Sequence, residues 1–235
     1  MSTCSIVIPV HNEAENIEEL FLDFWEKAGD LRPRIVEVLL VENGSQDETF
    51  GECQKLEKAL PGVVKAHHLA EPSYGDAVKL GMRNARGDIT VILEGDLLDV
   101  SFLLKSFSLI EEKKIDFVVG SKRHPEARDQ RPWQRRALTL FFNTVLKIFF
   151  RFPGTDTHGL KAIRTTAAKE LCKKSLTGGE AFQTEIVLLA HKLGYRVEEA
   201  PLAIRERRRT KIHPLRRFPK ILTIVKDIRR SLKRF

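Results

Sequence analysis

Short apolar runs alternate with stretches in which apolar residues recur every three or four positions, from residue 5 to about residue 120. Apolar runs of four to six residues predict buried strands, and the wider spacing predicts helices. The expected strands are residues 5–10, 37–41, 63–68, 88–93 and 116–120, and the expected helices are residues 15–27, 48–60, 74–86 and 101–113. Repeated strand–helix units predict an α/β fold, with a mainly parallel sheet flanked by helices on both faces.

This alternation changes after residue 120. The expected elements there are a polar loop at 124–133, a phenylalanine-rich helix at 137–152, a turn-rich stretch at 153–164, a helix at 180–194 and a short strand at 197–204. The chain shows no internal repeat and no flexible linker. We therefore expect one domain over residues 1–212 with a modified C-terminal third, followed by a tail at residues 213–235.

The tail has the spacing of an amphipathic helix. Its apolar residues recur at intervals of three and four, and Lys or Arg fills most of the other positions. The apolar positions are Phe218, Ile221, Leu222, Val225, Ile228, Leu232 and Phe235. Such a helix commonly lies in a membrane interface, where with residues 137–152 it would form a lipid-facing surface. Docking on the body of the protein, or a basic arm for nucleic acid or another protein, are the alternatives.

Charge separates the tail from the rest of the chain. The 235 residues carry a net charge of +8, but residues 205–235 alone carry +11 and residues 1–204 carry −3. The hydrophobic fraction of 42% excludes a disordered chain, and three cysteines exclude a disulfide scaffold. Because the basic charge is confined to the tail and no nucleic-acid motif is present, we expect no nucleic-acid partner.

The cysteines and the apolar segments bear on the compartment. Cys4, Cys53 and Cys172 are scattered and have no metal-ligand spacing, which predicts reduced thiols in a cytoplasmic protein. The first apolar run is a short strand rather than a signal peptide, and no run reaches the ~18 apolar residues of a transmembrane helix. We expect a peripheral protein on the cytoplasmic face of a membrane, or one held there by a membrane-protein partner.

Polar clusters follow three of the expected strands. Residues 9–13 follow the first strand, residues 42–47 the second, and Glu94-Gly95-Asp96 the fourth. Ligands of parallel sheets bind beyond the carboxyl ends of the strands. Two carboxylates separated by one glycine can share a Mg²⁺ or Mn²⁺ ion with a diphosphate, so Glu94 and Asp96 are candidate metal ligands. A solvated acidic turn is the alternative.

Four ordered motifs resemble the family 2 glycosyltransferases, which have a GT-A (Rossmann-like) fold. They are Ile8-Pro9-Val10-His11-Asn12-Glu13, the segment from Val41 to Thr49, Gly75-Asp76-Ala77 with Gly81 and Ala85-Arg86-Gly87-Asp88, and Glu94-Gly95-Asp96-Leu97. The resemblance implies a nucleotide-sugar donor and a divalent metal. It assigns Pro9, His11 and Glu13 to the base and ribose, Val41, Glu42 and Asn43 to the nucleoside pocket, and Gly75, Gly95 and Gln183 to the rest of the donor site.

The chain departs from the family pattern at several of these positions. Glu42-Asn43 stands where the family has Asp-Asp, His11 where it has Tyr, and Glu94 where it has the first Asp of D-x-D. The donor base therefore stays open, and Asp96 is the safer metal ligand. The same departures keep open a non-catalytic protein that binds a nucleotide sugar.

Later motifs resemble the dolichyl-phosphate and polyprenyl-phosphate mannosyltransferases within that family. They are Val119-Gly120-Ser121-Lys122, Arg135 with Asn143, Asp156-Thr157-His158-Gly159-Leu160-Lys161, Phe182-Gln183-Thr184-Glu185, and the stretch from Gly194 to Pro201. The resemblance covers roughly residues 4–212. It implies an inverting transferase that moves a sugar, with mannose from GDP-mannose as the leading choice, to a polyprenyl or dolichyl phosphate.

Such an acceptor explains the basic residues. A phosphate monoester is already an anion near neutral pH, so it needs cations to hold it rather than a general base. Lys122, Arg135, Arg205, Arg207 and Lys211 are the candidate clamp, and the motif register leaves Arg205 and Arg207 as alternatives for one position. A glycan or protein hydroxyl as acceptor would instead need a carboxylate base, for which Glu185 is a candidate; a structural role in its helix is the alternative.

Overall fold

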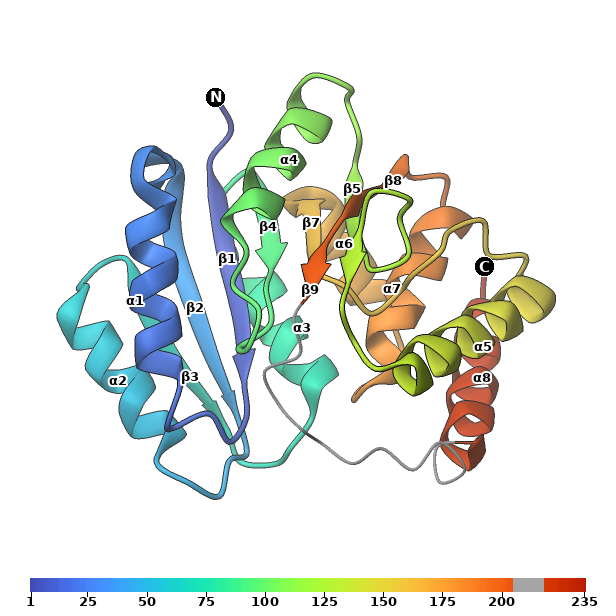
Figure 1. Ribbon diagram of the computed structural model, residues 1–235, viewed down its shortest axis with the longest axis horizontal. Coiled ribbons are helices and arrows are strands. Elements are labelled where there is room, and N and C mark those ends of the chain that lie inside the picture. Colours follow the sequence, from blue (N-terminus) through green and yellow to red (C-terminus); the bar gives the residue numbers. More distant parts are fainter. Residues whose placement is uncertain (205–217) are drawn as a thin grey trace.

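A seven-stranded mixed sheet forms the centre of the protein. The computed structural model describes residues 1–204 and 218–235, and within them the sheet has the order β3-β2-β1-β4-β7-β5-β8 (Figure 1). Its strands are β1 (Cys4–Val10), β2 (Ile35–Asn43), β3 (Val64–Leu69), β4 (Ile89–Ile92), β5 (Phe117–Ser121), β7 (Lys161–Arg164) and β8 (Val197–Pro201). β1 pairs in parallel with β2 and β4, β2 with β3, and β5 with β8. The predicted mainly parallel α/β sheet is thereby confirmed.

Helices cover both faces of this sheet. The helices are α1 (Ile17–Ala28), α2 (Thr49–Ala59), α3 (Tyr74–Asn84), α4 (Val100–Glu111), α5 (Trp133–Phe150), α6 (Thr165–Lys174), α7 (Ala181–Lys192) and α8 (Phe218–Leu232), with a 3-10 turn η1 (Gly29–Arg34) after α1. One apolar core joins the sheet to α1, α2 and α4, and the other joins it to α3, α5, α6, α7 and α8. The helices therefore form one layer on each face of the sheet, as in other α/β folds.

β1 shows how the sequence pattern produces two cores. All seven of its residues are buried, and its side chains alternate between the faces. Ile6 and Ile8 lie in the core with α1, whereas Val7 lies in the core with α3. A Cβ added to Gly81 of α3 would lie 2.2 Å from Val7 Cγ1, so only glycine lets this helix pack so closely on the strand.

A central strand, β7, and the helix α6 that follows it were not predicted from the sequence. The stretch 153–164, expected to consist of turns, ends in β7, which runs antiparallel between β4 and β5. It is followed directly by α6, for which no helix was predicted. The strand is four residues long and contains a buried lysine, Lys161, so it lacks the continuous apolar run that marks the other central strands.

The C-terminal third also differs in its boundaries. α5 begins at Trp133 rather than at residue 137, and the expected strand 197–204 is divided into β8 and the two-residue β9 (Ala203–Ile204). β9 pairs in parallel with β6 (Arg128–Asp129), which lies inside the expected polar loop 124–133. The expected boundary between body and tail, at residues 212 and 213, lies outside the described residues.

α8 packs on the body of the protein. Ile221, Ile224, Ile228 and Leu232 are buried in the core that includes α7, at the lower right of Figure 1. Ser231 Oγ donates a hydrogen bond to the buried carboxylate of Glu185 on α7. The tail is therefore an amphipathic helix as predicted, but its apolar face packs on α7 and does not form a lipid-facing surface with residues 137–152.

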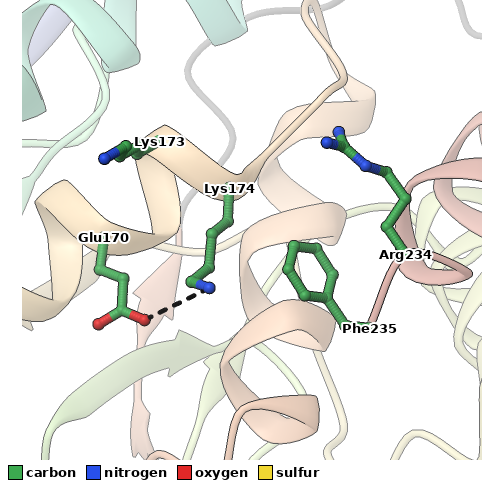
Figure 2. A pocket seen from close by; sticks show the side chains of 5 residues that line it. All are labelled: Glu170, Lys173, Lys174, Arg234 and Phe235. Carbon is green, nitrogen blue, oxygen red and sulfur yellow. Dashed lines mark ion pairs between the residues drawn. The ribbon is translucent and has the colours of Figure 1, made fainter.

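A small pocket lies where the C-terminal end of α8 meets α6. It has a volume of about 330 Å³ and is lined by Glu170, Lys173, Lys174, Arg234 and Phe235. Figure 2 shows Lys174 between Glu170, with which it forms an ion pair at 3.8 Å, and the ring of Phe235. The Nζ atom of Lys174 lies 5.0 Å from the centroid of that ring, so a cation–π contact adds to the attachment of α8.

The cysteines are free thiols. Cys4, Cys53 and Cys172 are all buried, and none forms a disulfide. Burial raises the pKa of the Cys4 and Cys53 thiols to about 12. Among the described helices, none combines the length and the apolar character needed to cross a membrane.

Candidate active site

The Glu94-Gly95-Asp96 turn follows β4 at the carboxyl edge of the parallel strands. The amide of Leu97 donates to the carbonyl oxygen of Glu94 at 2.9 Å and closes the turn. A Cβ added to Gly95 would lie 3.5 Å from the carbonyl oxygen of Pro9 and 3.7 Å from the side chain of Glu13. Two motifs separated by eighty residues in the sequence are therefore in contact here, as the sheet topology predicts.

The two carboxylates of this turn have different surroundings. Asp96 is exposed to solvent, whereas Glu94 is largely enclosed and accepts a hydrogen bond of 2.7 Å from the hydroxyl of Tyr74. Burial raises the pKa of Glu94, and the Tyr74 hydroxyl and the ammonium of Lys161 counteract that shift. Tyr74, at the first position of α3, was not identified from the sequence, since no motif residue suggested that a tyrosine would contact this turn.

The loops after β1 and β2 are joined by hydrogen bonds. His11 Nδ1 donates to the carbonyl oxygen of Asn43 at 2.7 Å, and the amide of Asn12 donates to Ser45 Oγ at 2.9 Å. The amide of Glu13 donates to Thr49 Oγ1 at 2.8 Å. The first two candidate donor-binding motifs therefore form one surface, on which His11 is exposed and Glu13 is buried.

Glu42 and Asn43 use their polar atoms to shape that surface. Both are buried at the end of β2, beside the buried Val41. Burial alone would raise the pKa of Glu42, but hydrogen bonds from Ser45 and His68 outweigh it and lower the pKa below its ordinary value. The side-chain oxygen of Asn43 accepts the amide of Ser73, the residue that caps α3. The pair Glu42-Asn43 thus connects the second loop to β3 and to the start of α3.

Gly75 is required where α3 approaches α7. A Cβ at this position would lie 2.7 Å from Phe182 Cβ and 2.9 Å from the backbone of residues 178 and 179. The start of α3 is therefore held against the segment that leads into α7. This contact also brings Tyr74, and through it Glu94, close to the second half of the chain.

A buried ion pair follows β5. Lys122, whose side chain is 9% exposed, lies 3.1 Å from Asp156 and donates at 2.7 Å to the carbonyl oxygen of His158. Burial opposes ionisation of Asp156, but Lys122 and the surrounding hydrogen bonds lower its pKa to about 2. Burial also lowers the pKa of His158, to about 4. Asp156 is therefore an ionised group and His158 a neutral one near pH 7.

Lys161 supplies a second cation at the same edge. It is 1% exposed, and its ammonium donates to the carbonyl oxygen of Gly159 at 2.7 Å and to Gln183 Oε1 at 3.0 Å. Burial lowers its pKa to about 8, and the charge of Glu94 acts in the opposite direction. The sequence placed Lys161, Asp156 and His158 in a motif but assigned them no role. Gln183, which the resemblance assigns to the donor site, accepts a hydrogen bond from Lys161.

Glu185 has a structural environment. Its carboxylate is fully buried and accepts hydrogen bonds from the amides of Leu176 and Thr177 at 2.8 and 2.9 Å, from the Thr177 hydroxyl and from Ser231. These donors fix the segment before α7 and the end of α8. The structure therefore favours the structural alternative for Glu185 over a general base.

The candidate residues fall into three groups. The donor motifs and the Glu94–Asp96 turn converge at one edge, and Lys122 and Gln183 lie in the cluster that Lys161 links electrostatically to Glu94. Arg135 lies in the first turn of α5, half-buried. Arg205, Arg207 and Lys211 lie outside the described residues.

The turn fits a divalent metal that is shared with a ligand. Glu94 and Asp96 offer two carboxylates on one closed turn, and the part of the chain that the structure describes contains no group of three or more His, Cys, Asp and Glu side chains for a metal. Mg²⁺ and Mn²⁺ are often held by one or two carboxylates together with phosphate oxygens and water. The residues present therefore suit a metal that arrives with a diphosphate.

Sequence comparison places the chain among transferases. Residues 5–172 match the family described as Glycosyl transferase family 2. Glycosyltransferase AglD of Haloferax volcanii is 26% identical over 215 residues, which are 90% of this chain and 34% of that protein. Dolichol-phosphate mannosyltransferase of Pyrococcus furiosus is 29% identical over 118 residues, 50% of this chain and 32% of that protein.

A third relative is the dolichyl-phosphate beta-glucosyltransferase of Saccharomyces cerevisiae, 27% identical over 222 residues, which are 86% of this chain and 66% of that protein. The chain thus spans about a third of the length of the two archaeal relatives and just under two thirds of the yeast protein.

A solved structure with the same fold is glucosyl-3-phosphoglycerate synthase from Mycobacterium tuberculosis, in complex with Mn²⁺, uridine-diphosphate-glucose and phosphoglyceric acid. Its TM-score is 0.66 at 19% identity, over 98% of this chain and 78% of that one. This likeness confirms the predicted fold class.

Proposed function

The chain belongs to glycosyl transferase family 2, and on that premise we propose that it transfers a sugar from a nucleotide-sugar donor to a polyprenyl phosphate at a membrane surface. Two relatives carry names of this type, a dolichol-phosphate mannosyltransferase and a dolichyl-phosphate beta-glucosyltransferase. A peripheral position on the cytoplasmic face, with or without a membrane-protein partner, is part of the same proposal.

The joined loops after β1 and β2 are the proposed nucleoside site. Pro9, His11 and Glu13 would line it from one loop, and Val41, Glu42 and Asn43 from the other. The hydrogen bond between His11 and the carbonyl oxygen of Asn43 supports this reading, because it gives the two loops a fixed relative position before a ligand arrives. Gly75 and Gly95 would leave room for the donor beside these loops.

The diphosphate would lie at the Glu94–Asp96 turn. A Mg²⁺ or Mn²⁺ ion held there by Glu94 and Asp96 would neutralise charge on the departing nucleoside diphosphate. Tyr74 orients the Glu94 carboxylate through its hydroxyl. The exposed Asp96 is the carboxylate that a ligand reaches first from solvent.

The observation that carries the proposed acceptor is the pair of enclosed cations, Lys122 and Lys161, at the same edge as this turn. A lipid phosphate is an anion before it reacts, so it requires positive charge rather than proton removal. The carboxylates nearby are poor bases: Asp156 is paired with Lys122 and has a pKa of about 2, and Glu185 is saturated with donors. Arg135, Arg205, Arg207 and Lys211 would complete the clamp.

Mannose from GDP-mannose, with inversion at the anomeric carbon, is the specific reaction we propose. One relative is named a mannosyltransferase and another a glucosyltransferase. The panel of nucleotide sugars described below therefore determines which sugar and which nucleotide base this chain uses. Transfer to a hydroxyl of a glycan or protein, and nucleotide-sugar binding without turnover, are the two competing functions.

The test is transfer of radiolabelled sugar into organic-extractable lipid, with a panel of nucleotide sugars, a polyprenyl phosphate and Mg²⁺ or Mn²⁺. We expect Asp96→Asn to lower the rate at least about a hundredfold, because it removes a charged ligand of the metal. The matched control is Asp99→Asn, three residues away, where asparagine preserves the cap that Asp99 gives α4 at the amide of Ser101.

Three results would contradict the proposal. Full activity of Asp96→Asn with an unchanged melting temperature would remove the metal role of this residue. A labelled product that stays in the aqueous phase would indicate a hydroxyl acceptor. Donor binding by calorimetry with no product from any nucleotide sugar would indicate a non-catalytic protein.

A further inference from the structure

α5 has one face on the protein and one in solvent. Its buried residues are Phe142, Asn143 and Leu146, which lie on one side of the helix. The ring of Phe142 packs edge-on against His158 with a centroid distance of 5.3 Å, and Asn143 Nδ2 donates to the carbonyl oxygen of Thr155 at 2.6 Å. The inner face of α5 therefore rests on the loop that carries Asp156 (Figure 1).

The outer face carries large apolar side chains. Trp133 is 72% exposed, Leu140 50% and Ile148 71%. Trp133, Leu140 and Ile148 are separated by seven and eight residues, so they form a stripe along one side of the helix, about 22 Å long at 1.5 Å per residue. Large apolar side chains that gather on one exposed face of a helix commonly mark an interaction site.

The charged residues of α5 itself are all positive. Trp133–Phe150 contains no Asp or Glu, and its exposed charged residues are Arg136 and Lys147. The exposed Arg151 follows directly. Basic residues beside an apolar helical stripe, with tryptophan at one end, are the composition of helices that lie in the interface of anionic membranes.

A pocket extends this surface at the C-terminal end of α5. It has a volume of about 620 Å³ and lies between the end of α5, α7 and α8. Its lining combines the aromatic residues Phe149, Phe150 and Phe152 with basic residues that include Lys192, Arg229 and Lys233. A phosphate-bearing amphiphile matches this combination, since its head group pairs with the cations and its chain packs on the rings.

We infer that the protein docks on a bilayer of anionic lipids through the outer face of α5 and the basic-aromatic pocket at its C-terminal end. This inference rests on the proposed function in one respect, namely that the partner is a lipid surface. It assigns the contact to α5 and not to the apolar face of α8, which is buried. Docked in this way, the loop with Asp156 and His158 lies directly behind the membrane-facing helix.

The main experiment is flotation of the full chain with vesicles, without sugar donor or acceptor. One vesicle is phosphatidylcholine alone, and the other contains about a third phosphatidylglycerol. We expect binding to the anionic vesicle, and at least about tenfold weaker binding for Leu140→Asp/Ile148→Asp. The matched control is Leu104→Asp/Leu222→Asp, since Leu104 and Leu222 are 54% and 71% exposed on α4 and α8.

The charge component is tested with a second pair of variants. Arg136→Glu/Lys147→Glu should also weaken binding to the anionic vesicle about tenfold or more, and the loss should shrink as salt is added. Lys27→Glu/Lys58→Glu changes the same charge on exposed positions of α1 and α2 and should bind like the unmodified chain. Equal losses from both pairs would mean that net charge, not this face, attracts the protein, and would overturn the assignment.

Trp133 gives a direct readout of contact. The chain has two tryptophans, so Trp25→Phe leaves Trp133 as the sole source of indole emission. We expect a blue shift and quenching by brominated lipid on anionic vesicles. Vesicle binding without a change in Trp133 emission would overturn the inference, and so would a dimer that Leu140→Asp/Ile148→Asp dissociates. Because no donor is present, failure here leaves the transfer assay unaffected, and a failed transfer assay leaves this result intact.

Discussion

α5 and α8 have similar patterns of apolar and basic residues, but they differ in how much of their apolar surface is buried. Both have apolar residues at helical spacing and basic residues between them. α8 buries Ile221, Ile224, Ile228 and Leu232 against the body, whereas α5 buries three residues and exposes a stripe that includes Ile148. Periodicity thus establishes that a helix has an apolar face but not what covers it.

The difference originates in α7. Residues Ala181–Ala190 of this helix are all buried, so α7 needs protein on every side. α8 supplies one of those sides and thereby uses its own apolar face. α5 buries Phe142 and Leu146 in the same core and attaches Asn143 to the carbonyl oxygen of Thr155, but its large apolar residues Trp133, Leu140 and Ile148 are exposed.

The largest expected effect comes from a matched pair of isoleucines. Ile228→Ala on α8 should lower the free energy of unfolding by about 2–5 kcal/mol, because Ile228 is fully buried and leaves a cavity. Ile148→Ala on α5 should change it by no more than about 0.5 kcal/mol, because that side chain is 71% exposed. Urea unfolding followed by circular dichroism measures both. Similar values for the two variants would show that the two faces do not differ as described.

Acid should weaken the contacts that hold α5 and the residues after it on the body of the protein. Phe142 of α5 packs on His158, and Phe152, two residues beyond α5, lies 5.8 Å from the ring of His191. Burial lowers the pKa of both histidines, that of His158 to about 4. Between about pH 6.5 and 4 the unfolded chain binds more protons at His158 than the folded chain, so the free energy of unfolding falls as the pH is lowered, and the lowered pKa of His191 acts in the same direction.

For His158 alone we expect a loss of about 2 kcal/mol between pH 7 and 4.5, somewhat less than the full shift implies because the ring is not completely enclosed. His158→Gln should show a correspondingly smaller acid loss in urea titrations at the two pH values. Asp156 does not affect this measurement, because the stability that its lowered pKa contributes is lost only below about pH 4. An unchanged pH dependence in the variant would mean that His158 titrates normally.

A smaller effect should come from the link between α8 and α7. Ser231→Ala removes one donor to the buried Glu185 carboxylate and should cost about 1–2 kcal/mol of unfolding free energy. Ser108→Ala is the control, since the Ser108 hydroxyl donates to Glu112 on the exposed surface. Transfer activity at a temperature where both are folded should be unaffected. A large loss of turnover in Ser231→Ala would instead support a catalytic role for Glu185.

The sequence was most informative in the first hundred residues. There β1, β2 and β4 are mainly apolar and polar loops follow them directly, so β1 to β4 could be predicted, and so could the convergence of these loops at one edge of the sheet. The second half depends on pairings across the chain. β7 enters the sheet between β4 and β5 by antiparallel pairing, which no local pattern encodes.

The candidate site shows the same division. Glu94 and Asp96 were found by their position after a strand. Tyr74 and Lys161 were missed as site residues because their importance comes from burial beside Glu94, and burial of a tyrosine hydroxyl or a lysine depends on tertiary packing. Glu185 was considered as a base because the sequence could not show that four donors already surround it.

The three native cysteines are buried, so they should react little with thiol-specific labels. Thiolates, not thiols, react with maleimides, and Cys4 and Cys53 have a pKa of about 12, while Cys172 is also buried. A single cysteine introduced at an exposed position such as Leu140 or Leu222 should therefore accept a fluorophore or spin label without removal of the native cysteines. The molecule is in effect ready for spectroscopic mapping of its surface in its natural sequence background.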